Sequence, residues 1–246
     1  MATEREPFEG FFEEDFEMYL PPRRKDRKFN DDRLLIKHRL HSLGELIAPG
    51  LGEAGLDLDF KTSLSHPYTF NKFSVDSQWV YFARKEKETK PLKKLFGEFL
   101  GKDLDMHYCH VILVAEINLD GVELALKIHQ QAWWDGQNVK NRCNKEDARK
   151  KLTDALNQQS GFILSIHNWK KEYVCGKLTH GDVANYMKYY TPGNHWFHLR
   201  MSLPKETVIP MEAGFAEFAG EKLAGLAPIY KLIEWRKDND CVFGGG

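Results

Sequence analysis

Residues His110 to Gln131 read HVILVAEINLDGVELALKIHQQ, a pattern typical of one long antiparallel hairpin. Asp120-Gly121 favours a two-residue turn in which both residues adopt left-handed backbone angles. If these two residues form the loop, Leu119 faces Val122, and the pairs that follow back along the strands are all apolar. These pairs are Ile117–Leu124, Ala115–Leu126 and Leu113–Ile128. One face of the hairpin is therefore predicted to belong to the core, whereas the other face carries His110, Glu116, Glu123, Lys127 and His129.

The rest of the chain switches between helical and strand-like patterns without regular alternation. Apolar residues follow the helical period at 30–47, 144–156, 180–190, 211–223 and 228–233, and strand-like segments occupy 56–65, 75–84, 162–167 and 194–203. Pro49-Gly50 is expected to end the first helix, and Thr179 with Asp182 resembles a capping box at the start of the third. This order favours an α+β fold over a repeated strand–helix fold.

We therefore predict a single α+β domain over residues 1–246, with a central antiparallel sheet and helices packed on its apolar face. Residues 1–30 form an N-terminal arm with a basic loop between Arg23 and Lys28, and residues 85–102 form a helical insertion. The size of 246 residues is sufficient for one large core.

Composition narrows the classes of protein. The formal net charge is −1, so the chain as a whole is not attracted to nucleic acid or to an acidic membrane. The longest apolar run, Val111–Ala115, is too short to span a bilayer, and the N-terminal residues lack the apolar core of a secretory signal. Four cysteines without a C-x-x-C pair are expected to stay reduced. We predict a cytoplasmic protein without a membrane contact.

Several short motifs resemble a known family. FEGF at 8–11, EEDF at 13–16, LGEL at 43–46 and DSQWVYF at 76–82 are similar to motifs of the YktB-like family of bacterial proteins. LRM at 199–201, FAE at 215–217 and LAPI at 226–229 resemble a related family known only as a domain of unknown function. The resemblance implies a one-domain α+β fold around an antiparallel sheet. It implies no activity and no catalytic residue.

A candidate binding site follows from the alternation of the strands. If their apolar faces align, Lys127, His129, His198 and Arg200 gather on one polar face, and His167 adds to it from a neighbouring strand. Arg can bind an anion with two parallel hydrogen bonds, and His and Lys add further donors. The sequence thus predicts a binding module for a small anionic ligand or nucleic acid, either a nucleotide or a nucleic-acid segment. The alternative is that this face is simply the solvated side of the sheet.

Two other classes of function stay open, and the sequence does not settle whether the chain is an enzyme. Glu116 and Glu123 with nearby histidines could serve a metal-assisted hydrolase or nuclease, although no motif with metal-ligand spacing is present and we predict no metal site and no cofactor. Trp133 and Trp134 could instead form the surface of a protein-interaction component.

Overall fold

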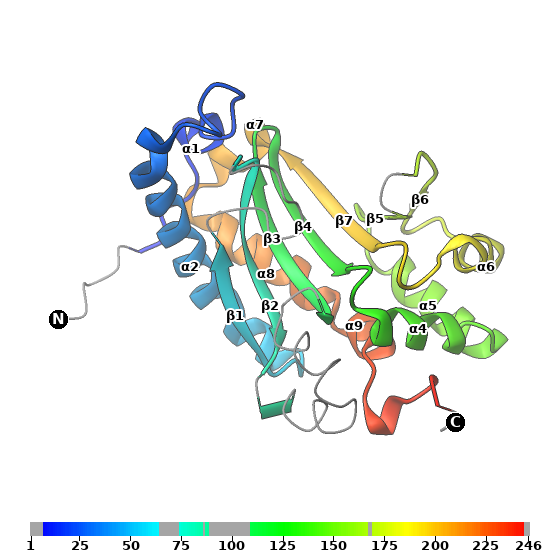
Figure 1. Ribbon diagram of the computed structural model, residues 1–246. Coiled ribbons are helices and arrows are strands. Elements are labelled where there is room, and N and C mark those ends of the chain that lie inside the picture. Colours follow the sequence, from blue (N-terminus) through cyan, green and yellow to red (C-terminus); the bar gives the residue numbers. More distant parts are fainter. Residues whose placement is uncertain (1–6, 64–73, 86, 89–108, 167–168, 244–246) are drawn as a thin grey trace. The chain divides into compact units, whose positions relative to one another are not determined.

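The computed structural model describes residues 7–63, 74–85, 87–88, 109–166 and 169–243 (Figure 1). Its sheet has seven strands in the order β1-β2-β3-β4-β7-β5-β6 and is antiparallel. The strands are β1 (Leu58–Ser63), β2 (Ser77–Arg84), β3 (Val111–Asn118), β4 (Gly121–Ile128), β5 (Ile163–Ile166), β6 (Glu172–Val174) and β7 (Phe197–Pro204). The predicted α+β class with one antiparallel sheet is confirmed.

Helices lie before, between and after the strands of the described chain. They are α1 (Glu13–Glu17), α2 (Asn30–Glu53), α4 (Trp133–Arg142), α5 (Glu146–Asn157), α6 (His180–Tyr189), α7 (Lys205–Val208), α8 (Phe215–Gly225) and α9 (Ala227–Ile233). Three short 3₁₀ turns, Arg27–Phe29, Ile209–Gly214 and Lys237–Asn239, join them. In the described residues no helix is both long and apolar enough to cross a membrane.

The chain divides into two compact units. Unit 1 contains residues 1–82, 114–124 and 202–224, and unit 2 contains residues 83–113, 125–201 and 225–246. Strands β2, β3, β4 and β7 each contribute residues to both units. One domain over the whole chain stays a prediction.

The core of unit 1 is built on aromatic rings from both ends of that unit's sequence. The rings of Phe8 and Phe11 meet edge to face with centroids 5.4 Å apart, and Phe11 meets Phe215 of α8 at 5.7 Å. Both Phe8 and Phe11 belong to the FEGF motif and are buried. The conspicuous aromatic motif at the start of the chain therefore has a packing role.

Helix α2 continues past the end that Pro49-Gly50 predicted. The helix starts at Asn30 after a 3₁₀ turn, and it continues through Pro49 to Glu53. A proline inside a helix removes one hydrogen bond and costs about 3 kcal/mol. Leu51 lies beyond Pro49 and is 1% exposed, so burial of this side chain favours the extra turn.

The hairpin predicted from 110–131 is confirmed as β3 and β4, but its turn differs. Asp120 does not adopt a left-handed conformation, because Glu212 is the only non-glycine residue with positive φ in the described ranges. The side chain of Asn118 instead accepts hydrogen bonds from the N–H groups of Asp120 (2.8 Å) and Gly121 (3.2 Å). This side-chain turn closes the loop without two left-handed residues.

In unit 2 the strands β5 and β7 pair with Ser165 opposite His198 and Leu164 opposite Leu199. Helix α6 begins with the predicted capping box: Asp182 N–H donates to Thr179 Oγ1, and Asp182 Oδ2 accepts from Thr179 N–H. Hydrogen bonds from Thr179 lower the pKa of Asp182 below its usual value. That carboxylate is therefore ionised and committed to the start of the helix.

Other expectations concern the arm, the insertion and the cysteines. The basic loop of the arm is neutralised in part by acids, since Arg23 pairs with Glu17 at 2.9 Å and Arg24 with Asp76 at 3.3 Å. The predicted helical insertion at 85–102 lies almost entirely outside the described residues. All four cysteines are free.

Candidate functional site

Four of the five residues predicted to bind an anion lie in one part of unit 2. His198 and Arg200 alternate along β7 and so share one of its faces, and Trp196 directly precedes the strand at the same spacing. The ring of His129 meets the ring of Trp196 at 4.5 Å, which places the polar side of β4, with Lys127, on that same face. His167, the fifth residue, lies outside the described residues.

This polar face is much less open than the sequence suggests. Lys127 is 4% exposed and His129 is 8% exposed. His198 and Arg200 are half-buried, and the guanidinium of Arg200 forms an ion pair with Glu172 of β6. A ligand on this face would have to compete with Glu172 for Arg200. Binding of an anion by these residues stays a prediction.

The residues of the hydrolase alternative do not assemble a metal centre. Glu116 is buried and Glu123 is half-buried, both in unit 1. In the part of the chain that the structure describes, no group of three or more His, Cys, Asp or Glu side chains is placed to hold a metal ion.

A cavity of about 390 Å³ opens elsewhere in unit 2, beside α6. Its lining comes from the end of β5, the connection to β6, β6 itself and α6, and consists of Ile166, Trp169, Lys171, Tyr173, Asn185 and Tyr189. We call this cavity the aromatic pocket. Cavities of this size accept small molecules, and mostly apolar walls with a few polar groups are typical of ligand sites.

Helix α6 holds the pocket in place through its buried side. Tyr186 is fully buried, its hydroxyl donates to the backbone carbonyl of Ser165 at 3.2 Å, and its ring meets Phe197 at 5.5 Å. Asn185 and Tyr189 are one helical turn apart, and so both reach the pocket when Tyr186 is anchored. The part of the wall that Asn185 and Tyr189 form is therefore helical.

One wall of the pocket is formed by three residues that two contacts join. The Asn185 amide donates a hydrogen bond to the hydroxyl oxygen of Tyr173 at 2.9 Å. The Lys171 ammonium lies 4.7 Å from the centre of the Tyr173 ring, within cation–π distance. This wall offers a cation and an amide beside the buried ring of Tyr173.

The second wall is an exposed aromatic platform. The rings of Trp169 and Tyr189 lie 5.4 Å apart, and the ammonium of Lys188 lies 5.7 Å from the Tyr189 ring. Trp169 is 41% exposed and Tyr189 is 44% exposed. Large aromatic residues that stay this open at the mouth of a cavity provide faces on which a flat ring can stack.

The charge of this region differs from that of the whole chain. Residues 125–201 contain twelve lysines and arginines but six aspartates and glutamates, whereas the chain as a whole carries −1. Of those acids, Asp135 is buried, Asp182 caps α6 and Glu172 is paired with Arg200. Residues 125–201 taken together therefore carry a positive net charge, which favours an anionic ligand over a cationic one.

Sequence reasoning missed the aromatic pocket. Strand β6 has only three residues, too few for a recognisable alternation, and the pocket joins residues from three elements and a connection. The available signals were Trp169-Lys170-Lys171 directly after a strand, and Asn185 with Tyr189 on the helix face next to the apolar one. Neither signal shows by itself that the two segments meet.

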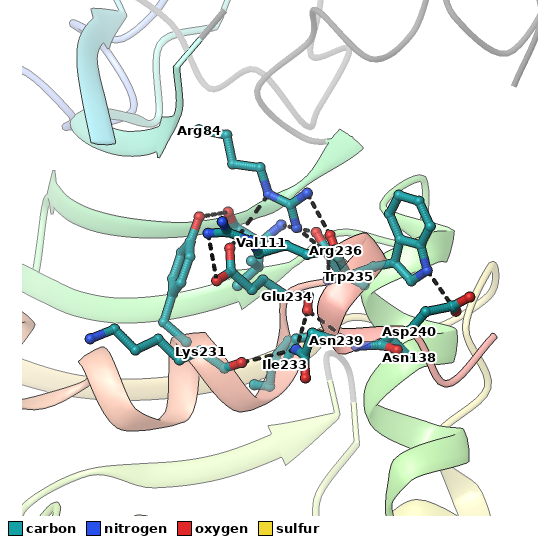
Figure 2. Close-up of polar contacts among 12 residues, drawn as sticks. Arg84, Val111, Asn138, Lys231, Ile233, Glu234, Trp235, Arg236, Asn239 and Asp240 are labelled. Carbon is teal, nitrogen blue, oxygen red and sulfur yellow. Dashed lines mark hydrogen bonds and ion pairs between the residues drawn. The ribbon is translucent and has the colours of Figure 1, made fainter. Parts of the chain in front are cut away.

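A second polar cluster of unit 2 is buried and has a structural role. Asp135, near the start of α4, accepts hydrogen bonds from the backbone N–H groups of Val111 (2.7 Å) and Trp235 (2.5 Å) and from Arg84 (2.7 Å). Arg84 also donates to the carbonyl of Trp235 and lies 3.8 Å from Glu234 (Figure 2). We call Arg84, Asp135 and Glu234 the buried ionic cluster.

The C-terminal segment is held on α4 next to this cluster. Asn138 donates to the carbonyls of Ile233 and Glu234 and accepts from the N–H of Cys241, as Figure 2 shows in part. Trp134 packs against Trp235 and against Phe243, with ring centroids 6.0 and 5.2 Å apart. Trp134 therefore serves internal packing, while Trp133 is 39% exposed. A protein partner at these tryptophans stays a prediction.

No protein-family model matches the chain, and no curated protein matches it either. The resemblance to the YktB-like family thus stays a prediction.

Proposed function

We propose that this protein is a binding module for an anionic ligand with a flat ring, a nucleotide or a segment of nucleic acid, and that the ligand occupies the aromatic pocket. The single observation that carries the proposal is the pairing of each aromatic wall with a lysine. Lys171 lies at the Tyr173 ring and Lys188 at the Tyr189 ring. A ring stacked on Trp169 or Tyr189, the two exposed rings of the pocket, would have an ammonium group within reach of its phosphate.

The two parts of such a ligand would be bound by different forces. Stacking of a base on an aromatic side chain contributes about 1–3 kcal/mol, and this term does not depend on charge. The contact of a phosphate with a lysine is electrostatic and weakens with salt. A nucleotide should therefore bind more tightly than its nucleoside or inorganic phosphate, and added salt should reduce only the phosphate contribution.

The test is a binding titration, measured by isothermal titration calorimetry, with nucleoside monophosphates, a nucleoside and inorganic phosphate. Trp169→Ala is expected to weaken nucleotide binding about 5- to 150-fold, because the stacking contribution is lost. Lys171→Ala is expected to reduce the preference for the nucleotide over the nucleoside. Both side chains are exposed, so neither change should disturb folding.

Matched controls come from the same unit. Trp133→Ala removes a tryptophan of nearly equal exposure, 39%, that does not line the pocket, and Lys145→Ala removes an exposed lysine elsewhere. Equal losses of affinity in Trp169→Ala and Trp133→Ala would contradict the assignment of the site. Binding of a neutral oligosaccharide with no binding of nucleotides would overturn the proposed ligand class.

A further inference from the structure

The connection between α6 and β7, residues 190–196, is held against one face of α4. A Cβ atom at Gly136 would lie 2.6 Å from the Tyr190 hydroxyl oxygen, so the helix and the connection are closely packed there. The Lys140 ammonium donates a hydrogen bond to the Tyr190 carbonyl at 2.5 Å. Trp133, Gly136 and Lys140 follow the helical period and therefore share this face of α4.

Two exposed tryptophan rings contact this connection, one on α4 and one at the aromatic pocket. A Cβ atom at Gly193 would lie 3.5 Å from the Trp133 ring, so this ring lies directly beside the backbone. The ring of His195, two residues further on, meets the Trp169 ring at 5.5 Å. His195 is held in place because its Nδ1 accepts a hydrogen bond from Thr191 N–H at 3.0 Å. A short, anchored segment therefore links the aromatic pocket to Trp133.

Lysines lie near both tryptophans. Lys170 directly follows Trp169 and is exposed, and Lys171 and Lys188 lie at the pocket. On the other side, an ammonium group has three N–H donors, and among the described residues Lys140 uses one of them, on the Tyr190 carbonyl. Positive charge thus accompanies the exposed rings from the pocket to α4.

We propose, on the basis of the proposed function, that the ligand is a single-stranded segment of nucleic acid that extends from the aromatic pocket to Trp133. One base would lie in the pocket, and another base would stack on Trp133. Exposed aromatic rings beside lysines suit a single strand, because every base has a face that can stack and every linkage carries a phosphate. Stacking does not select one base over another, so the arrangement implies no sequence preference.

The test is calorimetric titration with thymidine monophosphate and with a single strand of four thymidylates. The strand is expected to bind more than about tenfold more tightly, because a second stacked base contributes about 5- to 150-fold in affinity. Trp133→Ala should remove most of this gain, whereas Trp133→Phe, which retains a ring, should preserve part of it. The comparison is between affinity ratios, so the greater number of ways in which a longer strand can bind cancels out.

Phe12→Ala is the matched control, since Phe12 is an aromatic residue of similar exposure, 40%, that belongs to unit 1. This change should leave the ratio of the two affinities as it is in wild type. Inorganic polyphosphate of the same charge should bind more weakly than the strand, because it cannot stack. A longer thymidylate strand should also bind more weakly once it is paired with its complement, because a duplex keeps its bases inside the stack.

The two proposals fail in different ways. If thymidine monophosphate binds and Trp169→Ala weakens it, but the gain of the four-nucleotide strand is the same in wild type and Trp133→Ala, the extension to Trp133 is wrong and the proposed function stands. Polyphosphate or a duplex that binds as tightly as the single strand would likewise overturn the extension. If only the strand binds, an equal affinity in Trp133→Ala and Phe12→Ala contradicts the extension, and a selective loss in Trp133→Ala supports it. If wild type binds neither ligand, both proposals are overturned.

Discussion

Replacement of Asp135 by asparagine should destabilise the protein strongly, although the two side chains have nearly the same shape. Asp135 is 1% exposed and accepts hydrogen bonds from Arg84 and from the N–H groups of Val111 and Trp235. The amide keeps one acceptor, but its NH₂ group would face a donor. The change also leaves the buried Arg84 with Glu234, 3.8 Å away, as its remaining partner in the buried ionic cluster.

The magnitude follows from the burial of this pair. The Arg84 side chain is 3% exposed, and removal of one partner of a buried ion pair costs about 3–5 kcal/mol. One kcal/mol shifts the melting temperature of a chain of this size by about 2–4 °C, so Tm should fall by roughly 6–20 °C. Urea unfolding followed by tryptophan fluorescence and a thermal melt followed by circular dichroism measure both quantities.

Asp238→Asn is the matched control. The Asp238 side chain is 80% exposed and lies 3.5 Å from Arg236, an arrangement that contributes about 0–1 kcal/mol. If Asp135→Asn and Asp238→Asn lower the unfolding free energy equally, the assignment of a structural role to the buried ionic cluster is refuted.

Three further predictions test the surroundings of individual residues. Gly121→Ala should prevent soluble expression or lower Tm sharply, since a Cβ atom at this position would lie 2.0 Å from the carbonyl oxygen of Leu203; a melt like that of wild type would contradict this close approach. Burial raises the pKa of the Cys143 thiol to about 12. In the native protein, Cys143 should therefore react with iodoacetamide much more slowly than the half-buried Cys241, as measured by peptide mass spectrometry. Equal labelling rates would refute the burial of Cys143. Burial raises the pKa of Glu234 above its usual value of 4.5. Between pH 4.5 and this raised pKa, the folded state binds more protons than the unfolded state. The free energy of unfolding should therefore fall as the pH rises through this window. Glu234→Gln should remove this part of the slope in urea titrations at several pH values, and an unchanged slope would show that other groups cause it.

The sequence was sufficient to predict those elements whose apolar spacing matches their burial. In β7, Phe197, Leu199 and Met201 are buried while the residues between them are not, so the alternation was readable directly. The capping box of α6 was predictable because its two residues are neighbours in sequence and satisfy each other.

Prediction was weaker where a distant contact overrides the local preference. Pro49 would end a solvent-exposed helix, but α2 continues through it to bury Leu51. Helix α4 was not predicted, because its inward residues include Asp135 and Asn138, which are polar and buried through partners far along the chain. A polar residue on an inward face looks like a surface residue until its partners are known.

The same reasoning explains why the sequence predicted a site on the polar face of the sheet, whereas the candidate pocket lies at the edge of the sheet. Alternation along a strand shows which side chains share a face, and it placed Lys127 and His129 together. It does not show whether the face is open, and Lys127 is 4% exposed.

The last paired strand of the sheet, β6, has only three residues, so side chains near it meet α6 and a connection rather than a further strand. A pocket whose walls come from three different segments can form there, and its aromatic walls stay accessible because no strand covers them. Positive charge from residues 125–201 then favours an anion at this edge, where a ligand can enter without displacing a buried group.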